Sequence, residues 1–581
     1  MKKRIITSLL FLGVIPIIVL GGSSCTFEDI LDHSSEKHKE LDKSQNNEKE
    51  YDFVITPENI TGNFREFLQS IVEYHSNILI KNGTYEIELT NGDGVRPKDS
   101  CTITFEPNAK IKVRPNRLEV YSVFDTRNRK NITFNNPFLI GDKDEHLGTT
   151  GEWCYGIRIV ECENIVVRNA NISKFWGDGL VIREAKNIKI YSPTLEHNRR
   201  QGISITSCEN VDIYNPTISY TSGTSPAFGI DIEPNFNGEH VKNLRIHNAI
   251  FKYNASGKNE YPAGFCLSTH MIGKALPKGK KEYISTYFDI ELINPTFYGD
   301  ALIVSTPTDL VHGKLVVKNP VFYDTRETSL NFFNHQSSNF KTEIISPVMH
   351  NSVQKEKSSI YYTPILFWCF SARTTKTTGT QNIKITNPKI IANNTAKYRA
   401  SIINNITNSS FSNDMKNVTI ENIIQEGYET TLMNHSGSDK KNIKQRLSTF
   451  SNLDETFVLS IDPKSSKLPN IKSGTEVSKT LSNALADFRD YNSSPIIYLT
   501  EDIPISGFEL YYVNNSANKA PLSLNFGSKS ALTKKTIERK NHPKHFSNKI
   551  IIPYGSYVTL SKKGANTWKI IDEKSSDNIS Y

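Results

Sequence analysis

The sequence predicts an all-β protein built as a right-handed parallel β-helix, with an N-terminal helical cap and a small C-terminal β-rich domain. A phrase of Asn, alternating apolar and polar residues, then Asn or Ser recurs, its second Asn or Ser falling at 136, 169, 192, 215, 248, 294, 319, 346, 387 and 422. A second phrase keeps step with it and places glycine at 156, 179, 202 and 229. The composition is rich in Asn, Ser, Thr, Ile and Tyr with only 5 Met, which favours strands over helices.

The spacing of the phrases indicates the type of β architecture. The tightest interval between them is 23 residues, seen twice in a row from 169 to 215. Such a unit has room for two or more short strands and their turns but no helix, which is typical of stacked coils. A β-sandwich with coincidental spacing is the alternative, and it does not explain why the two phrases stay in step. One turn is expected to carry a ladder of stacked asparagines: Asn164, Asn187, Asn210 and Asn243.

The N-terminus, "MKKRIITSLLFLGVIPIIVLGGSSC", predicts export. A basic start leads into an apolar run too short for a membrane span, and small residues follow up to Cys25. The segment resembles a bacterial lipoprotein signal, which implies that Cys25 carries the lipid; a plain secretory signal is the alternative. We therefore expect an exported lipoprotein at the outer membrane or cell surface, with the periplasm as second choice.

The remaining chain divides by composition. Polar residues 26–51 suit a flexible tether. An amphipathic helix, "NFREFLQSIVEY", and the strands after it suit an end cap, because a solenoid must shield its open core. The expected segments are: 1–25 signal peptide, 26–51 tether, 52–125 cap and first coils, 126–440 β-helix, 441–475 linker, and 476–581 C-terminal domain.

The cap and coils resemble the pectin-lyase-like superfamily, whose members often begin with such a helix and an "I-x-x-G-x-Y" strand, here Ile80 to Tyr85. The resemblance covers about residues 52–440 and implies the fold and a carbohydrate substrate class. In the C-terminal domain, "EVSKTLSNALADFRDY" has helical spacing and later segments read as strands. That domain could bind glycan, cap the solenoid or join protomers into a homo-oligomer.

The stretch "GIDIEPN" marks the candidate site. Ile230 and Ile232 are expected to point inward, so Asp231 and Glu233 stand together on the outer face, where like charges repel unless something uses them. Stacking the coils on the glycine phrase brings further charged and aromatic residues to that face. We predict Asp231, Glu233 and Asp178 as catalytic, and as substrate-binding Arg200, Arg199, His197, Trp176, Trp153, Tyr155, Gln201 and Arg158. His270, one coil later, is a weaker candidate.

Acids that share a face with arginines serve three chemistries. In glycoside hydrolysis, one carboxylic acid protonates the leaving oxygen and a second carboxylate activates water or attacks the sugar carbon. In a lyase, a base removes the proton beside a uronate carboxyl whose charge is neutralised by a cation or an Arg. In calcium binding, clustered carboxylates hold the ion. Residues two apart on a strand lie about 6.5–7 Å apart at Cα, which allows either carboxyl separation that glycosidases use. The alternative is a purely structural role, in which Asp231 and Glu233 form ion pairs with arginines such as Arg200 or Arg158 and stabilise the stacking of the coils.

The sequence departs from specific branches of the superfamily. The polygalacturonase branch carries catalytic Asp residues on consecutive coils, and Asp178 and Asp231 lie on the matching face, but the Asp-Asp pair, the Gly-His-Gly and a clear Arg-x-Lys of that branch are missing. The calcium and Arg motifs of pectate lyases and the "DPHD" motif of alginate epimerases are missing as well. The resemblance therefore implies the fold and the carbohydrate substrate class of this protein, but it does not imply a specific activity.

Other features limit the function classes. The net charge is +8, three of these charges lie at residues 2–4, and no long basic run follows, so nucleic acid is not an expected partner. Six cysteines besides Cys25 form no C-x-x-C pair, which argues against zinc, and most should be small buried groups. No cofactor is expected, with calcium as the alternative.

The function expected from the sequence is a surface or periplasmic enzyme that degrades polysaccharide, with hydrolysis ahead of elimination. A non-catalytic glycan-binding or adhesin-like lipoprotein is the alternative, and it predicts that the acids are capped by Arg or covered by "TSGTSPAF".

Overall fold

The computed structural model describes residues 51–461 with gaps at 91, 93, 237, 256–260, 275–281, 355–360, 370–378, 394–396, 398, 400, 408–414, 429 and 437–457. Beyond residue 461 it describes residue 521 and short strands. The chain divides into two units, Met1–Tyr51 and Asp52–Tyr581, and the second contains all the strands and helices described. The expected signal, tether and Cys25 lie outside the described residues.

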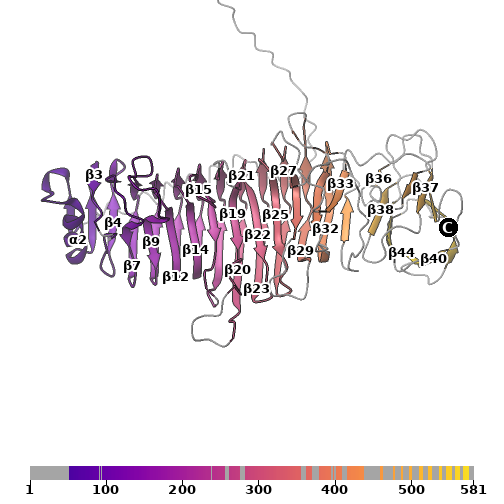
Figure 1. Cartoon of the computed structure of the whole chain (residues 1–581), viewed down its shortest axis with the longest axis horizontal. Helices are drawn as coiled ribbons and strands as arrows, with labels where there is room; N and C mark the ends of the chain where they lie inside the picture. Colours follow the sequence, from indigo (N-terminus) through magenta and orange to yellow (C-terminus); the bar gives the residue numbers. More distant parts are fainter. Residues whose placement is uncertain are drawn as a thin grey trace, which may run out of the picture. The chain divides into compact units, whose positions relative to one another are not determined.

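Strands β1 to β34 form one 34-stranded sheet in which every pairing is parallel. The strands follow one another in three ladders around each coil and stack side by side along one axis (Figure 1). These pairings confirm the parallel β-helix that the repeat predicts.

The first ladder carries the glycine phrase. Its strands are β6 (Val120–Asp125), β9 (Trp153–Val160), the first part of β12 (Asp178–Tyr191) and of β14 (Gln201–Tyr214), β16 (Ile230–Ile232), β19 (Ala263–Ser268), β22 (Ala301–Thr306), β25 (Thr328–His335), β28 (Thr363–Trp368), β31 (Ser401–Thr407) and β33 (Thr430–Ser436).

The second ladder carries the first half of the Asn phrase. Its strands are β1 (Phe53–Ile55), β2 (Asn77–Ile80), β4 (Thr102–Phe105), β7 (Lys130–Asn135), β10 (Glu163–Arg168), the later parts of β12 and β14, β17 (Val241–His247), β20 (Thr286–Ile293), β23 (Val311–Lys318), β26 (Phe340–Ile345), β29 (Thr380–Thr386), β32 (Met415–Glu426) and β34 (Val458–Ile461). β34 falls within the segment 441–475 that the composition assigned to a linker.

The third ladder consists mostly of strands of three residues. Its strands are β3 (Gly83–Ile87), β5 (Ala109–Val113), β8 (Phe138–Ile140), β11 (Asn171–Ser173), β13 (Thr194–Glu196), β15 (Thr217–Ser219), β18 (Ile250–Lys252), β21 (Thr296–Tyr298), β24 (Val321–Tyr323), β27 (Val348–His350), β30 (Lys389–Ile391) and the end of β32.

The turns between the second and third ladders explain the recurring Asn or Ser. All ten phrase positions from Asn136 to Asn422 have φ between 48° and 58°, the left-handed region that Asn tolerates better than most residues. The predicted Asn ladder is also present, because Nδ2 of Asn187 donates to Oδ1 of Asn164 at 3.1 Å and Asn210 donates to Asn187 at 3.2 Å. Asn243 continues it with a 2.8 Å bond to Asn210.

Inward side chains form one continuous core. Ile, Val, Leu and Phe from all three ladders are buried throughout the described coils, and the six cysteines after Cys25 are buried and unpaired, as small core groups would be. Gly156 and its partners in the glycine phrase face this core. A Cβ on Gly156 would lie 2.6 Å from Ile172 Cγ2 and 2.7 Å from the Gly179 carbonyl, so the close approach of coils needs glycine there.

The N-terminal end of the ladders carries α2 (Phe64–Tyr74), the expected amphipathic helix, preceded by the short 3₁₀ helix η1 (Pro57–Asn59). The side chain of Asn63 caps α2 by accepting a 2.8 Å bond from the Arg65 amide. The helix buries Phe64, Leu68, Ile71 and Val72 against the core. This placement fits the role of an end cap.

Beyond residue 461 the described strands form two further sheets. One contains β35 (Thr475–Val477), β37 (Ile496–Leu499), β39 (Leu522–Phe526) and β42 (Lys549–Ile552). The other contains β36 (Ala486–Asp487), β38 (Glu509–Val513), β43 (Tyr557–Lys562), β44 (Thr567–Lys574), β40 (Lys535–Glu538) and β41 (His545–Ser547). The helix expected from residue 476 is wrong at Glu476–Val477 and Ala486–Asp487, which pair as strands; its other residues lie outside the described part.

The described residues include no helix with the length and apolar character required to span a bilayer.

Candidate functional site

One outward-facing row of the first ladder runs through the candidate site. Arg158 pairs with Val181 on the next coil, Val181 with Ser204, Ser204 with Asp231, and Asp231 with Cys266. The flanking residues Ile230 and Ile232 are fully buried in the core. The alternation predicted for "GIDIE" is therefore present, and Arg158 lies three rungs, about 14 Å, from Asp231 along the solenoid.

Arg200, in the turn entering β14, connects three acids. Its Nη1 lies 3.2 Å from Asp178 Oδ2, and its Nη2 lies 3.6 Å from Glu233 Oε2. Its Nε lies 3.3 Å from Glu152 Oε2. Only 16% of the Arg200 side chain is exposed, so these pairs are poorly screened by water. Burial alone would lower the pKa of Arg200, but the surrounding carboxylates raise it, so the guanidinium stays charged.

Asp178 is held from two sides. The Ser204 hydroxyl donates a 2.6 Å hydrogen bond to Asp178 Oδ2, and Arg200 contacts the same oxygen. Burial raises the pKa of Asp178 to about 6, although the charge of Arg200 and the Ser204 bond oppose the rise. With its oxygens engaged in this way, Asp178 fits a positioning role for Arg200.

Asp231 is held differently. Gln201 Nε2 donates a 2.7 Å bond to Asp231 Oδ2, while Oδ1 is buried and has no hydrogen-bond partner among the described residues. No cationic side chain of the described residues lies within ion-pair distance of this carboxylate. Burial and the neighbouring charge of Glu233 raise the pKa of Asp231 to about 7. Asp231 is therefore the acid of this site most able to keep a proton near neutral pH.

Glu233 is the more accessible partner. It follows β16, its side chain is 23% exposed, and Oε1 lies 3.5 Å from His270 Nδ1. Burial raises its pKa, while Arg200 opposes the rise by favouring the ionised form. Burial thus raises the pKa of both carboxyls, but only Glu233 lies within ion-pair distance of Arg200, and two carboxyls in different surroundings are the usual arrangement of an acid and a base.

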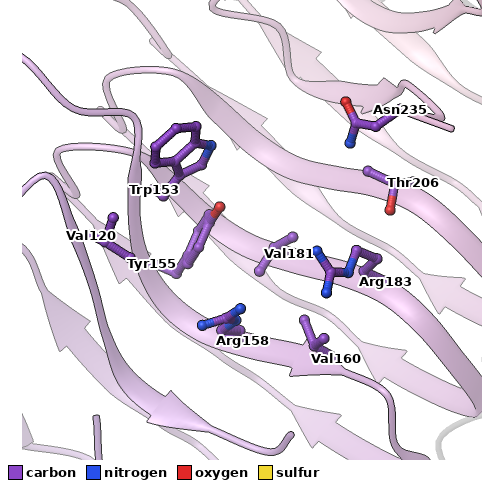
Figure 2. Close-up of a pocket in the computed structure, with 9 residues that line it drawn as sticks. All are labelled: Val120, Trp153, Tyr155, Arg158, Val160, Val181, Arg183, Thr206 and Asn235. Atoms are coloured by element: carbon purple, nitrogen blue, oxygen red, sulfur yellow. The ribbon is translucent and has the colours of Figure 1, made fainter. Parts of the chain in front are cut away.

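Two adjoining cavities open over these residues. The smaller, about 90 Å³, is lined by Trp153, Tyr155, Asp178, Val181, Arg200, Ser204, Ile205, Thr206, Asp231, Glu233 and Asn235. The larger, about 270 Å³, shares five of those residues and adds Val120, Arg158, Val160 and Arg183. Figure 2 shows the larger cavity, with Trp153 and Tyr155 on one side and Arg183 and Thr206 on the other. We call the two cavities together the groove.

Most residues predicted for the site meet at the groove. Its lining includes all three predicted catalytic acids and four predicted substrate-binding residues: Arg200, Trp153, Tyr155 and Arg158. Trp153 is 54% exposed and Tyr155 is nearly buried, so the Trp153 indole is the more accessible of the two aromatic side chains. Gln201 is fully buried and reaches the groove only through Asp231. No residue of the segment 221–228 lines either cavity.

Three predicted residues lie elsewhere. The Trp176 ring stacks on His146 with centroids 4.1 Å apart, and the Arg199 guanidinium lies 3.9 Å over the Trp176 ring. Arg199 also donates a 2.7 Å bond to the Gly151 carbonyl. His197 stacks on Tyr220 at 5.1 Å outside the groove. These side chains brace neighbouring turns, and none of the three lines either cavity.

The sequence patterns did not identify several residues that line the groove or contact its side chains. Glu152 pairs with Arg200, and Arg183, Thr206 and Asn235 line the cavities. Arg183 and Thr206 occupy outward-facing positions of the repeat, so the repeat could have identified them as candidate site residues. Glu152 and Asn235 lie in turns, where the repeat carries no information about direction.

The part of the chain that the structure describes contains no group of three or more His, Cys, Asp or Glu side chains placed to hold a metal ion. The carboxylates of the groove are instead engaged by Arg200, Ser204 and Gln201. The calcium alternative stays untested.

Comparison with known proteins bears on the fold. Residues 152–271 match the family model described as "Right handed beta helix region". The uncharacterized protein YclG of Bacillus subtilis is 33% identical over 120 residues, which is 18% of this chain and 20% of that protein. The matched segment thus spans about a fifth of that relative.

Solved structures with a similar chain path include PfbA, a surface adhesin of Streptococcus pneumoniae, with 12% identity over 68% of this chain and 92% of that one at TM-score 0.43. A family 28 exopolygalacturonase of Yersinia enterocolitica shows 11% identity over 66% of this chain and 76% of that one at TM-score 0.44. The family match confirms the right-handed parallel β-helix that the repeat predicted.

Proposed function

We propose that this protein is a polysaccharide-degrading enzyme, a glycoside hydrolase ahead of a lyase, that acts in the groove. The observation that carries the proposal is the state of Asp231. Its carboxyl is buried, its pKa is raised to about 7 by burial and by Glu233, and its Oδ1 has no partner among the described residues. Buried polar atoms usually have a hydrogen-bond partner, so the unengaged Oδ1 is available to a substrate.

The roles follow from the contacts. Asp231 is the general acid that protonates the leaving glycosidic oxygen, because it retains a proton near neutral pH. Glu233, two residues along the chain and beside Arg200, is the carboxylate that activates water or attacks the sugar. Asp178 and Ser204 hold Arg200 in place. Trp153 and Tyr155 offer aromatic faces for sugar rings.

A glycan-binding protein without catalysis is the second candidate. The observation that favours it is the pairing of Arg200 with both Asp178 and Glu233, because acids capped by Arg can brace a solenoid. Asp231 favours the catalytic candidate, since this capping does not extend to it.

The test is turnover of a polysaccharide panel by the purified mature chain. Both new reducing ends and the unsaturated product of elimination are measured, because only a lyase makes the latter. Asp231→Asn keeps shape and removes the proton, and we expect it to lower activity roughly 10²–10⁴-fold. Asp212→Asn, a matched change on the second-ladder part of β14, should leave activity unchanged. Full activity of both variants would place the chemistry elsewhere.

We further propose that Cys25 is lipidated and that residues 26–51 tether the protein to a membrane at the cell surface. The support is the basic, apolar and small-residue order of the N-terminus. A role of the C-terminal sheets in joining protomers or binding glycan stays a prediction.

A further inference from the structure

The loop that leads into the groove, residues 141–152, is much longer than the matching turns of the next two coils. It runs from the end of β8 at Ile140 to the start of β9 at Trp153, whereas those turns comprise only residues 174–177 and 197–200. A loop of this length leaves the regular path of the coil. The backbone groups at its end therefore need hydrogen-bond partners other than those of the ladders.

Three side chains from successive turns supply these partners. The His146 ring stacks on Trp176 with centroids 4.1 Å apart, and the Arg199 guanidinium lies 3.9 Å over the Trp176 ring. Trp176 Nε1 donates a 2.9 Å bond to the Thr150 carbonyl, and Arg199 Nη1 donates a 2.7 Å bond to the Gly151 carbonyl. We call His146, Trp176 and Arg199 the clamp.

The clamp has a buried base. His146 Nδ1 lies 2.8 Å from Asp142 Oδ2, and the side chains of both residues are fully buried. The Tyr121 hydroxyl donates to the other oxygen of Asp142. On its far side the loop presses against the neighbouring coil, because a Cβ on Gly151 would lie 2.5 Å from Glu119 Cα. The end of the loop is thus held between the clamp and that coil.

The two residues after the clamped carbonyls reach the groove. Glu152 Oε2 lies 3.3 Å from Arg200 Nε, and Trp153 lines both cavities. Arg199 and Arg200 are adjacent in one turn, so this turn holds Gly151 through the first arginine and Glu152 through the second. A displacement of the loop end would therefore change both the ion pair with Arg200 and the lining of the cavities.

We propose that Arg199 is a positioning residue of the groove, which through the clamp holds Glu152 against Arg200 and Trp153 at the cavities. Arg199 itself lines neither cavity. A guanidinium suits this role because it stacks on an indole and donates hydrogen bonds at the same time, which fixes orientation as well as distance. The inference rests on the proposed function where it concerns the groove acids, whereas the position of Trp153 is measured without turnover.

The first test is fluorine NMR of the full chain labelled with 5-fluorotryptophan. The chain has four tryptophans, whose resonances are assigned by Trp→Phe variants: Trp153, Trp176, Trp368 and Trp568. Arg199→Gln should move the Trp153 resonance as well as that of Trp176, whose ring loses the cation. Trp176→Phe keeps a ring in the stack but loses the donor to Thr150, so it should also move the Trp153 resonance. This second variant decides the matter if Arg199→Gln does not fold.

The second test is the pH–rate profile on the polysaccharide that the panel identifies. Burial raises the pKa of Glu233 and Glu152 adds to the rise, while Arg200 opposes it. Arg199→Gln releases Glu152, so the pKa of Glu233 falls and the acid limb of the profile moves to lower pH. The other charged or titratable groups around Glu233 stay in place: Arg200, Asp231, His270 and Lys274.

The variant should also lower kcat/KM roughly 10- to 100-fold, because the groove loses its geometry. Arg199→Lys keeps the charge and a donor but loses the planar stack, so it should restore part of both effects. The matched control is Arg168→Gln, which removes a guanidinium 5.5 Å over the Tyr191 ring, outside the groove. It should change neither the Trp153 resonance nor the acid limb.

Arg199→Gln that only loses thermal stability, with the Trp153 resonance and the acid limb of the wild type, would overturn the inference and leave the proposed function standing. Equal effects of Arg199→Gln and Arg168→Gln would overturn it as well. If the wild type turns over no glycan, the proposed catalysis fails and the Trp153 resonance alone decides the inference.

Discussion

Gln201 Nε2 donates a 2.7 Å hydrogen bond to Asp231 Oδ2 from the adjacent coil, and both residues are buried. The bond favours the ionised form of Asp231 and so opposes the rise in its pKa caused by burial and by Glu233. Gln201 thus acts through Asp231 and not on the sugar directly.

Replacing Gln201 should change the pH dependence of activity. Gln201→Met keeps the length of the side chain and removes the donor, so the pKa of Asp231 rises further. The alkaline limb of the pH–rate profile, where the general acid loses its proton, should move upward by up to about one pH unit. A profile of kcat against pH on the polysaccharide that the panel identifies measures the shift. An unmoved limb with a uniformly lower rate would mean that Gln201 only supports packing.

Asp231 should also make stability depend on pH. Burial raises the pKa of Asp231 to about 7 and that of Asp178 to about 6, above their ordinary value near 4. The native protein then binds more protons than the unfolded chain between about pH 4 and 7, so the free energy of unfolding falls as pH rises through that window.

Asp231→Asn removes the contribution of Asp231 to this pH dependence. Relative to wild type, the variant should gain stability between pH 4 and pH 8, by on the order of a few kcal/mol. Thermal unfolding of both proteins at pH 4, 6 and 8 provides the measurement. A constant difference in Tm across the three pH values would contradict the raised pKa.

The Asn ladder should contribute to stability in two separable ways. Asn187 has φ of 55° and bonds to Asn164 and Asn210. Asn187→Ala loses both bonds and forces alanine into the left-handed region, which should cost about 1–3 kcal/mol. Asn187→Gly loses the bonds but accepts that φ, so it should be less destabilised than the Ala variant in thermal unfolding. Equal losses would show that backbone conformation is not the reason for Asn.

Membrane attachment is tested at Cys25. If this residue bears the lipid, Cys25→Ser should move the protein from the membrane fraction to the soluble fraction, because the attached acyl chains supply the anchor. Fractionation of cells followed by detection of the full chain is sufficient. Serine substitution at the buried Cys208 serves as the control and should not alter the fraction. A Cys25→Ser protein that stays with the membrane would place the anchor elsewhere.

The sequence alone determined the coils and the orientation of strand residues. A fixed interval between phrases sets which strands are adjacent, and strand alternation then decides that Ile230 faces the core and Asp231 faces outward. The positive φ at the recurring Asn and Ser positions follows from the same repeat. These features depend on neighbours in sequence and on a period, so they can be read without coordinates.

Only the tertiary structure decided what the turn residues do. Arg199 and Arg200 are adjacent in one turn, yet Arg199 lies over Trp176 and Arg200 lies among the groove acids. Trp176 in turn stacks on His146, thirty residues earlier in the chain. The direction of a turn side chain is set by local backbone dihedrals and by contacts with distant segments, neither of which the repeat encodes. For the same reason the unengaged Oδ1 of Asp231 became visible only once the coils were stacked.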